Sequence, residues 1–414
     1  MPAPDGAPIM VVAGEASGDL HGATLCRALR ALAPSRPLVG MGGARMAAAG
    51  LTRLADVTGA AAVGGTEALS PLPALLRAWR RLKAEMHGPG RPGTLVLIDF
   101  PEFNLRLARV ARRAGIPVVY FIPPQVWAWR PWRARVIARR VSLVLAVFPF
   151  ESALYRRAGA RVEFVGHPVL DALAGAPARE EARRRLGLDA GATVVGLLPG
   201  SRTQEIVRTL PVLQAAAVRI AAARPGTRFV LAAMERSPAG PDPIETLRGP
   251  APPIRVVRGD TYAVMRAADL LLVNSGTATL EAGLLGTPMV VCYRLSRLTE
   301  AWVRLLVRVP WISLANIVLG RAVVPEIYQA ALTPERLAGV ALGLLDSPAA
   351  IEEQRAAFRE LGSALGAPGV GLRAARHILD LAEPRVHFER AQRAAPAARV
   401  DGEAAGMSGA THPC

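Results

Sequence analysis

Short runs of apolar residues recur along this chain, and each run ends in a turn that leads into a helical pattern. Ile9–Ala13, Thr94–Ile98 and Val194–Leu198 are examples, followed by a glycine, an aspartate and a Pro-Gly pair respectively. Uninterrupted aliphatic runs of this length are typical of strands buried on both faces, which occur in parallel sheets covered by helices. The pattern predicts an α/β fold of doubly wound, Rossmann-like sheets.

The pattern occurs twice, with a break near residue 175. Further expected strands are Val118–Ile122, Leu143–Phe148, Phe229–Ala232, Ile254–Val257, Leu270–Val273 and Met289–Cys292. Two facing domains are therefore predicted, at residues 9–173 and 174–383, with a flexible N-terminus at 1–8 and a disordered tail at 384–414. Ligands of open α/β sheets bind beyond the carboxyl ends of the strands, so we expect a cleft between the domains.

The charge balance is strongly basic. The chain has 414 residues, with 50 Lys and Arg against 33 Asp and Glu, a net charge of +17, and Lys83 is the only lysine. Such a chain is expected to bind anions: nucleic acid, anionic membrane or phosphorylated small molecules. Part of the arginine excess is also what the coding bias of a GC-rich genome would produce.

Cysteine content and hydropathy bear on the compartment. Cys26, Cys292 and Cys414 form no disulfide framework and no C-x-x-C pair, which favours a reducing compartment and argues against a structural zinc site. We find no signal peptide and no apolar run of about 18 residues, so no membrane-spanning helix is expected. The sequence favours a cytosolic protein and leaves attachment to a membrane surface open.

The first strand-to-helix turn is glycine-rich. Glu15, Ser17, Gly18 and Asp19 lie in this turn and are candidate binding residues, because free amides at a helix N-terminus favour an anion. A tight turn capped by Ser17 or Asp19 explains the pattern equally well. The spacing is not G-x-G-x-x-G, so a dinucleotide fingerprint is not supported.

Asp99 follows directly after an apolar strand. At the carboxyl end of a strand it would face the cleft, where burial raises the pKa of a carboxyl group toward that of a useful general base. The alternative is a helix start, since Pro101 and Glu102 come next.

The first turn of the second half contains a Pro-Gly-Ser-Arg run. Gly200 and Ser201 offer amides to a phosphate, Arg202 adds a cation that binds phosphate in bidentate fashion, and Glu205 is a further candidate binding residue. An ordinary capped turn with a solvent-facing Arg202 is the alternative.

A later turn follows another buried strand. Ser275, Gly276 and Thr277 supply hydroxyls and amides for a phosphate, and Glu281 would accept hydrogen bonds from sugar hydroxyls. Helix capping accounts for the Ser and Thr, but not for the acid. Asn316 is a weaker candidate binding residue.

Two segments combine aromatic or aliphatic residues with arginine. The run from Val126 to Arg140 would stack bases or dock at lipid headgroups, although a buried aromatic cluster is slightly favoured for Trp127. The stretch Leu69–Leu82 suits an interfacial amphipathic helix, which a packed surface helix resembles.

Taken in order, these motifs resemble the lipid-A-disaccharide synthase family over residues 9–380. The resemblance is carried by seven motifs: Gly14-Glu15-Ala16-Ser17-Gly18-Asp19, Asp99-Phe100-Pro101-Glu102-Phe103-Asn104, Val126-Trp127-Ala128-Trp129, Gly166-His167-Pro168, Pro199-Gly200-Ser201-Arg202, Ser275-Gly276-Thr277-Ala278-Thr279-Leu280-Glu281 and Ser313-Leu314-Ala315-Asn316.

The resemblance implies a GT-B glycosyltransferase of two Rossmann-like domains. Such an enzyme joins UDP-2,3-diacylglucosamine to 2,3-diacylglucosamine 1-phosphate, giving lipid A disaccharide 1-phosphate and UDP. It implies inversion at the anomeric carbon, no metal or other cofactor, and a peripheral position on the cytosolic face of the inner membrane of a Gram-negative bacterium. The oligomeric state is left open.

The resemblance also implies roles for single residues. Asp99 matches the base that takes the proton from the acceptor 6-hydroxyl, and Arg202 would neutralise the departing diphosphate. Glu281 would bind ribose hydroxyls and Asn316 would lie near the donor. Glu15, with Ser17, would approach the sugar or its phosphate.

Two other functions compete with this one. A UDP-N-acetylglucosamine 2-epimerase would share the architecture but leave the aliphatic and Trp/Arg segments unexplained. A nucleic-acid-binding module would explain the charge, but the chain has neither helix-turn-helix spacing nor an RNP pattern, so no nucleic acid partner is expected.

Overall fold

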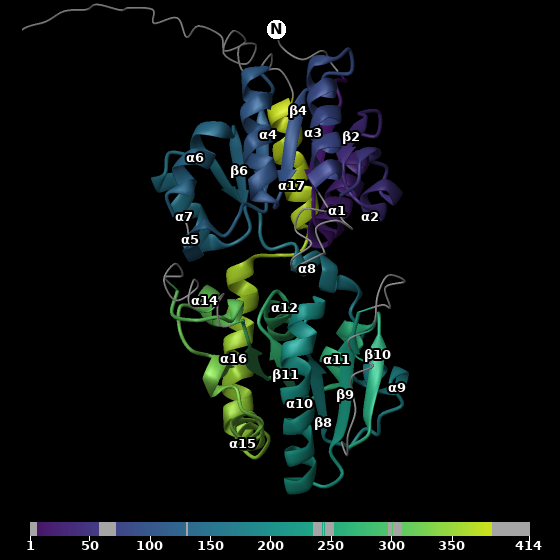
Figure 1. The fold of residues 1–414 in the computed structure, drawn as a ribbon, viewed down its shortest axis with the longest axis vertical. Coiled ribbons are helices and arrows are strands. Elements are labelled where there is room, and N and C mark those ends of the chain that lie inside the picture. The colour runs from purple at the N-terminus through teal and green to yellow at the C-terminus, as the bar shows by residue number, and fades with distance from the viewer. Residues whose placement is uncertain are drawn as a thin grey trace, which may run out of the picture.

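A computed structural model describes residues 6–57, 72–129, 131–234, 242, 244, 252–296, 300 and 309–382. The expectations for the terminal segments 1–5 and 384–414, and the start of the Leu69–Leu82 stretch, lie outside these residues. The described chain forms two sheets, each covered by helices on both faces (Figure 1).

The first sheet has seven parallel strands in the order β3-β2-β1-β4-β5-β6-β7. Its strands are β1 Ile9–Ala13, β2 Leu38–Met41, β3 Thr52–Ala55, β4 Thr94–Ile98, β5 Val118–Phe121, β6 Leu143–Ala146 and β7 Val162–Phe164. Its helices are α1 Ala16–Leu32, α2 Ala44–Ala48, α3 Leu72–His87, α4 Pro101–Arg113, α5 Val126–Trp129, α6 Arg133–Arg140, α7 Pro149–Arg157 and α8 Val169–Ala172.

The second sheet has six parallel strands in the order β10-β9-β8-β11-β12-β13. Its strands are β8 Val194–Leu198, β9 Arg228–Ala233, β10 Ile254–Arg258, β11 Leu270–Asn274, β12 Met289–Tyr293 and β13 Glu326–Tyr328. Its helices are α9 Arg179–Arg185, α10 Thr203–Ala223, α11 Thr261–Ala267, α12 Ala278–Leu284, α14 Leu314–Leu319, α15 Pro334–Leu345 and α16 Pro348–Leu365.

The central strands of each sheet are buried on both faces, as the unbroken apolar runs predict. In β1 the side chains of Ile9, Val11 and Ala13 enter one core and those of Met10 and Val12 enter another, because successive side chains of a strand point to opposite faces. The predicted α/β class is confirmed.

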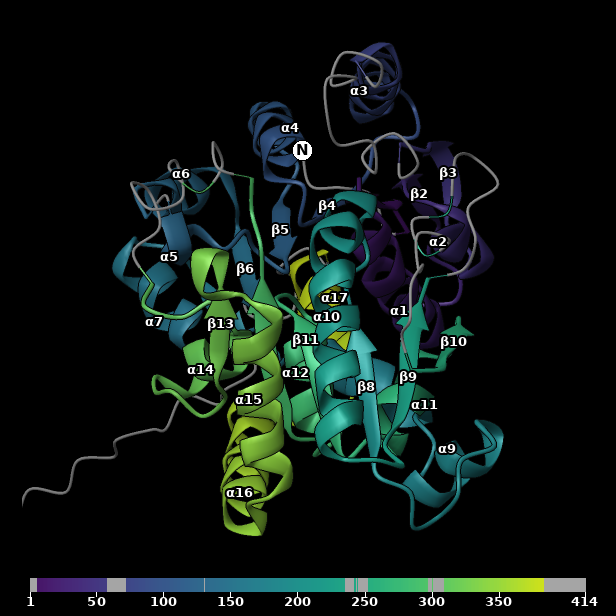
Figure 2. The same cartoon turned by 60° about the horizontal axis from the view of Figure 1, so that its bottom comes forward.

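Helix α10 is the one described helix that is long and apolar enough, by length and composition, to cross a membrane. Its apolar residues Ile206, Leu210, Leu213 and Ile220 pack in the core of the second sheet. Figure 2 shows α10 and α15 in front of that sheet.

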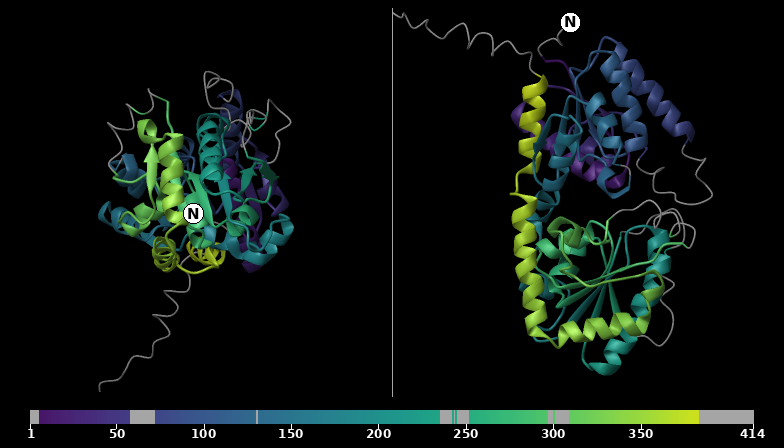
Figure 3. Two further views of the ribbon diagram at one scale, coloured as in Figure 1. Left: turned by 90° about the horizontal axis from the view of Figure 1, so that it is seen from below. Right: turned by 90° about the vertical axis from the view of Figure 1, so that its left-hand side faces the viewer.

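The last described helix, α17 (Val370–Ala382), returns to the first domain and packs against α1. In Figure 3 (right) α16 and α17 form a column along one side of both domains. The segment that leads into α17 passes beside the segment around α8 that first joins the two domains. The Asp171 carboxylate accepts hydrogen bonds from the amides of residues 369, 370 and 371, and Arg373 Nε donates to Val165 O at 3.0 Å. Two adjacent crossings therefore join the domains.

Candidate active site

Asp99 lies in a strained turn at the carboxyl end of β4. Asp99 and Phe100 have φ values of 46° and 47°, in the left-handed region that non-glycine residues seldom adopt. Two such residues cost on the order of 1–3 kcal/mol each, so the surrounding structure must hold them. Helix α4 begins at Pro101 with Phe100 in the N-cap position, so Asp99 is not the helix cap.

Two side chains hold this turn through the carbonyl oxygen of Asp99. Asn104 Nδ2 donates to it at 2.7 Å and also to Ile98 O at 3.1 Å, and the Tyr120 hydroxyl donates to it at 2.8 Å. The sequence analysis did not identify Tyr120 as a functional residue. Its signal was a hydroxyl inside the otherwise apolar strand β5.

The first glycine turn packs directly against the Asp99 turn. A Cβ at Gly14 would lie 2.3 Å from Phe100 Cδ1, so only glycine lets the Phe100 ring approach. The neighbouring Glu15 then faces Asp99. Burial first, and the charge of Glu15 second, raise the pKa of Asp99 to about 6, while the amide of Phe100 and the charge of Arg202 oppose the rise.

Arg202, whose charge lowers the pKa of Asp99, belongs to the second domain. Arg202 precedes the first residue of α10, at the carboxyl end of β8, and its side chain is 73% exposed. The charge of Arg202 therefore reaches the Asp99 carboxyl group, and each of the two residues follows the carboxyl end of a strand. That these two residues are the catalytic ones stays a prediction.

In the second domain, Gly200, Ser201 and Arg202 form a turn closed by Glu205. Glu205 Oε2 accepts from the amides of Ser201 at 3.2 Å and Arg202 at 3.4 Å, and Glu205 Oε1 accepts from Arg202 Nη1 at 3.1 Å. Gly200 has a φ of 116°, a conformation that suits glycine. Glu205 thus engages the Ser201 amide, one of the two amides that the sequence assigned to a phosphate.

The turn after β11 supplies a second set of polar groups. Gly276 and Thr277 are exposed, whereas the Ser275 hydroxyl donates to Ile312 O at 2.6 Å. Glu281 Oε1 accepts from the Tyr262 hydroxyl at 3.0 Å, and burial raises the pKa of Glu281. Tyr262 is a partner that the sequence analysis did not identify.

Asp19 has a structural role in this structure. Its carboxylate is buried and accepts from the amides of Gly43 at 2.8 Å, Met46 at 3.0 Å and Arg45 at 3.1 Å, which are the first amides of α2. The alternative that Ser17 or Asp19 caps α1 is wrong: Glu15 is the N-cap residue of α1, and Asp19 instead binds amides at the start of α2.

Gly18 and Asn316 are also engaged within the protein. A Cβ at Gly18 would lie 3.2 Å from Ala13 Cβ, so this glycine sets how closely α1 packs on β1. The buried Asn316 amide donates to Val324 O at 3.0 Å and Glu326 Oε1 at 2.8 Å. Ser17, in contrast, is exposed in the first turn of α1.

Trp127 belongs to a packed aromatic cluster. Its ring lies edge-on to Phe150, with centroids 5.2 Å apart, and its Nε1 donates to Glu151 Oε1 at 3.0 Å. The buried-cluster alternative for Trp127 is therefore confirmed. Glu151 is fully buried, and burial raises its pKa to about 8, opposed by the hydrogen bonds from Trp127 and from backbone amides.

The described part of the aliphatic stretch is helix α3. Leu72 and Leu76 are 50% and 48% exposed, and Trp132, before α6, is 61% exposed. Trp79 of α3 packs edge-on against Phe103 of α4, with centroids 5.6 Å apart. Leu72, Leu76 and Trp79 have the i, i+4, i+7 spacing of one helix face, so the exposed leucines continue the face on which Trp79 is packed. Within the described ranges, no three His, Cys, Asp or Glu side chains are grouped so as to hold a metal ion.

The comparisons with known proteins agree with the motif order. A family model described as lipid-A-disaccharide synthetase matches residues 9–363. A lipid-A-disaccharide synthase from Syntrophus aciditrophicus (strain SB) is 43% identical over 376 residues, covering 90% of this chain and 97% of that protein. Another, from Myxococcus xanthus (strain DK1622), is 41% identical over 382 residues, covering 91% and 98%.

Solved structures share the architecture at lower identity. The glycotransferase of kitacinnamycin has a TM-score of 0.60 and 21% identity, covering 92% of this chain and 100% of that chain. A UDP-GlcNAc 2-epimerase from Neisseria meningitidis bound to UDP-GlcNAc has a TM-score of 0.59 and 11% identity, covering 90% and 99%. At such identities the likeness concerns the fold alone, whereas the sequence relatives define the family. The chain belongs to the lipid-A-disaccharide synthase family and is a glycosyltransferase with the GT-B fold.

Proposed function

We propose that this enzyme condenses UDP-2,3-diacylglucosamine with 2,3-diacylglucosamine 1-phosphate, with inversion at the anomeric carbon and without a metal. One observation carries the proposal: a carboxyl group whose pKa is raised to about 6, chiefly by burial, lies at the domain junction near Arg202. An inverting transfer needs a base to take the proton of the acceptor hydroxyl. It also needs a cation to stabilise the negative charge of the departing UDP.

In the proposed step, Asp99 accepts the proton of the acceptor 6-hydroxyl. The hydroxyl oxygen forms a bond to the anomeric carbon on the face opposite UDP, and the bond from that carbon to the diphosphate oxygen breaks. Asp99 lies in the left-handed turn that follows β4, and hydrogen bonds from Asn104 and Tyr120 to its carbonyl oxygen hold that turn. A base held this way loses little freedom on reaching the transition state.

The departing UDP gains a diphosphate charge that the protein must stabilise. Arg202 and the exposed Gly276 and Thr277 are the groups we assign to that charge, with Glu281 on the ribose hydroxyls. Because Glu205 engages the amides of Ser201 and Arg202, a diphosphate would share or replace that contact. The positive charge of Arg202 and the amide dipoles of the turn would supply the stabilisation that a metal ion supplies in other enzymes.

We further propose that the enzyme works on an anionic membrane surface, at the cytosolic face of the inner membrane. The exposed leucines of α3 and the net charge of +17 support this, since apolar insertion and attraction to anionic headgroups act together. We expect the enzyme to be found in membrane fractions at low salt and to be released from them by a high-salt wash. Absence from membranes at low salt, or full retention in high salt, contradicts it.

The reaction is tested with purified enzyme and both acylated glucosamine substrates in the presence of a metal chelator. We expect equal amounts of disaccharide 1-phosphate and UDP, with the new linkage inverted relative to the donor. No product, or product only after metal is added, would overturn the proposal.

The base is tested by Asp99→Asn, with Glu102→Gln as its matched control. Glu102 is an exposed acid on the first turn of α4 whose carboxylate pairs with Arg133 at 2.6 Å. Asp99→Asn should keep donor binding and lose about 10²-fold or more in turnover, the usual contribution of a general base. Equal turnover of the two variants would exclude Asp99 as the base.

A further inference from the structure

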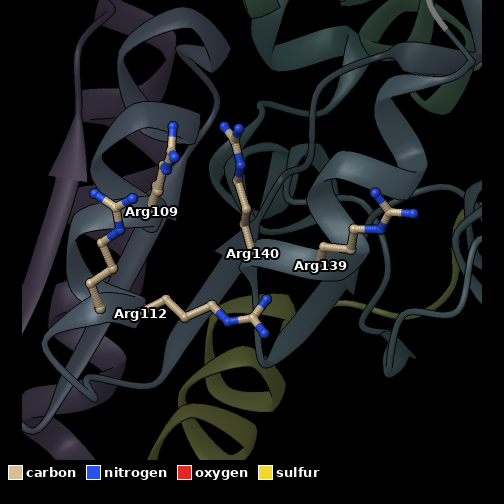
Figure 4. A pocket seen from close by; sticks show the side chains of 5 residues that line it. Arg109, Arg112, Arg139 and Arg140 are labelled. Carbon is tan, nitrogen blue, oxygen red and sulfur yellow. The ribbon is translucent and has the colours of Figure 1, made fainter.

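Five arginines line one open cavity at the surface between α4 and α6: four are exposed and Arg140 is half-buried. Its volume is about 360 Å³, and its lining consists of Arg109, Arg112, Arg113, Arg139 and Arg140. In Figure 4 the side chains of Arg109 and Arg140 extend alongside each other between the two helices, whereas Arg139 points away from α4. Arg140 Nη1 donates to Leu105 O at 3.0 Å, which ties the α6 side of the cavity to α4.

The local sequence supplies no counter-charge for this cluster. From Phe103 to Phe150 the chain contains nine arginines and no aspartate, glutamate or lysine. Burial, and then the charge of Arg109, lower the pKa of Arg140, as expected for a cation facing other cations. Guanidinium groups brought together in this way repel one another.

Helix dipoles compensate only part of this charge. The cavity lies at the C-terminal ends of α4 and α6, and each such end carries roughly half a negative charge. Two ends therefore offset about one of the five positive charges. The remaining charge favours an anion in the cavity.

The cavity is separate from the candidate active site. An adjoining cavity of about 230 Å³ shares Arg112, Arg139 and Arg140 and is also lined by Val118, at the amino end of β5, and by Ser142, just before β6. Asp99 lies at the opposite, carboxyl end of the same sheet. An anion bound here would not contact the groups assigned to the transfer.

We propose that this five-arginine cavity is a binding site for a phosphate-bearing anion. Guanidinium groups match phosphate oxygens in bidentate geometry, and several of them around one cavity suit a phosphate diester or a diphosphate better than a single carboxylate. The phosphate of an anionic lipid headgroup and a soluble phosphorylated compound share this chemistry. The inference does not rest on the transferase activity.

Pyrophosphate is the soluble probe, titrated calorimetrically into full-length enzyme kept saturated with UDP. The test variant is R112Q/R139Q, and the control is R228Q/R376Q, which removes two exposed arginines elsewhere. Thermal unfolding verifies that both variants fold. Pyrophosphate should bind R112Q/R139Q about tenfold or more weakly than the control, and R112K/R139K should regain part of the loss because the charge returns.

Vesicles of phosphatidylglycerol, with phosphatidylcholine as the neutral reference, provide the second arm. If R112Q/R139Q loses binding to the anionic vesicles beyond the loss in R228Q/R376Q, the site takes a lipid headgroup. If only pyrophosphate binding falls, the site takes a soluble phosphate. If neither probe distinguishes R112Q/R139Q from the control, the cavity is not an anion site and the proposal is wrong.

Discussion

The carboxyl group of Asp99, at the end of β4, is coupled electrostatically to the guanidinium of Arg202, at the start of α10. Burial and then Glu15 raise the pKa of Asp99 to about 6, and Arg202 is among the groups that oppose the rise. The two residues lie 103 positions apart in the sequence. A charge of the second domain therefore acts on the carboxyl group of the first domain at which we place the reaction.

The pH dependence of turnover should follow the pKa of Asp99. A general base works only when deprotonated, so the rate should rise with pH up to about 6 and then level off. Glu15→Gln removes a negative charge that raises this pKa, so its rate profile should shift to lower pH. Steady-state rates between pH 4.5 and 8 test this; Glu102→Gln should leave the profile in place, and an unmoved profile in Glu15→Gln would contradict the coupling.

Arg202→Ala should weaken UDP binding. A charge-assisted hydrogen bond contributes about 1.5–3 kcal/mol, so the dissociation constant should rise about 10- to 100-fold. Glu205→Gln removes the negative partner and keeps the guanidinium, so its affinity should stay within about threefold of wild type, as expected for an exposed pair. Calorimetric titration with UDP measures both variants. Similar affinities in the two would show that Arg202 is not a phosphate ligand.

Asp19→Ala should destabilise the fold and leave UDP affinity unchanged in the folded fraction. Three amides of the 43–46 turn lose their acceptor, at a cost of about 2–4 kcal/mol. Asp19→Asn keeps one oxygen for Gly43 and Met46 and should lose less. Chemical denaturation and UDP titration separate the two effects: full stability with reduced affinity would assign Asp19 to the ligand instead.

Glu151 should make the fold less stable as pH rises. Its pKa is raised from 4.5 to about 8, chiefly by burial, so the folded state holds a proton that the unfolded state releases between these values. The contribution of Glu151 to the free energy of unfolding is fully present below pH 4.5 and is lost as the pH rises to about 8. Urea denaturation at pH 5.5 and 8 should show a smaller decline in Glu151→Gln than in wild type or in Glu180→Gln, an exposed control. Equal declines in all three would refute the buried titration.

Most central strands were predictable, whereas among the edge strands only β10 was expected from the sequence. Ile9–Ala13, Thr94–Ile98 and Val194–Leu198 form strands with the predicted bounds, because each is buried on both faces and therefore entirely apolar. Thr52–Ala55 and Glu326–Tyr328, both at sheet edges, are short and partly exposed. Without an apolar run they leave no signal of their own in the sequence.

The candidate site also has a part that the sequence indicated and a part that it could not indicate. Strand ends and glycine turns located Asp99, Glu15 and Arg202, since ligands of parallel sheets bind where the strands end. The same motifs could not tell that the Asp19 carboxylate caps α2 or that Glu205 closes its own turn. Those contacts depend on where the amides of other turns lie in space.

The sequence by itself determined the α/β class, the two series of strands and the family, because each depends on local pattern and motif order. Only the tertiary structure decided which polar groups face a ligand and which are consumed by backbone amides. It also decided that arginines of α4 and α6 share one cavity, and that α17 returns to the first domain. The physical reason is that pKa, strain and charge compensation depend on neighbours in space, and residues distant in the sequence provide most of them.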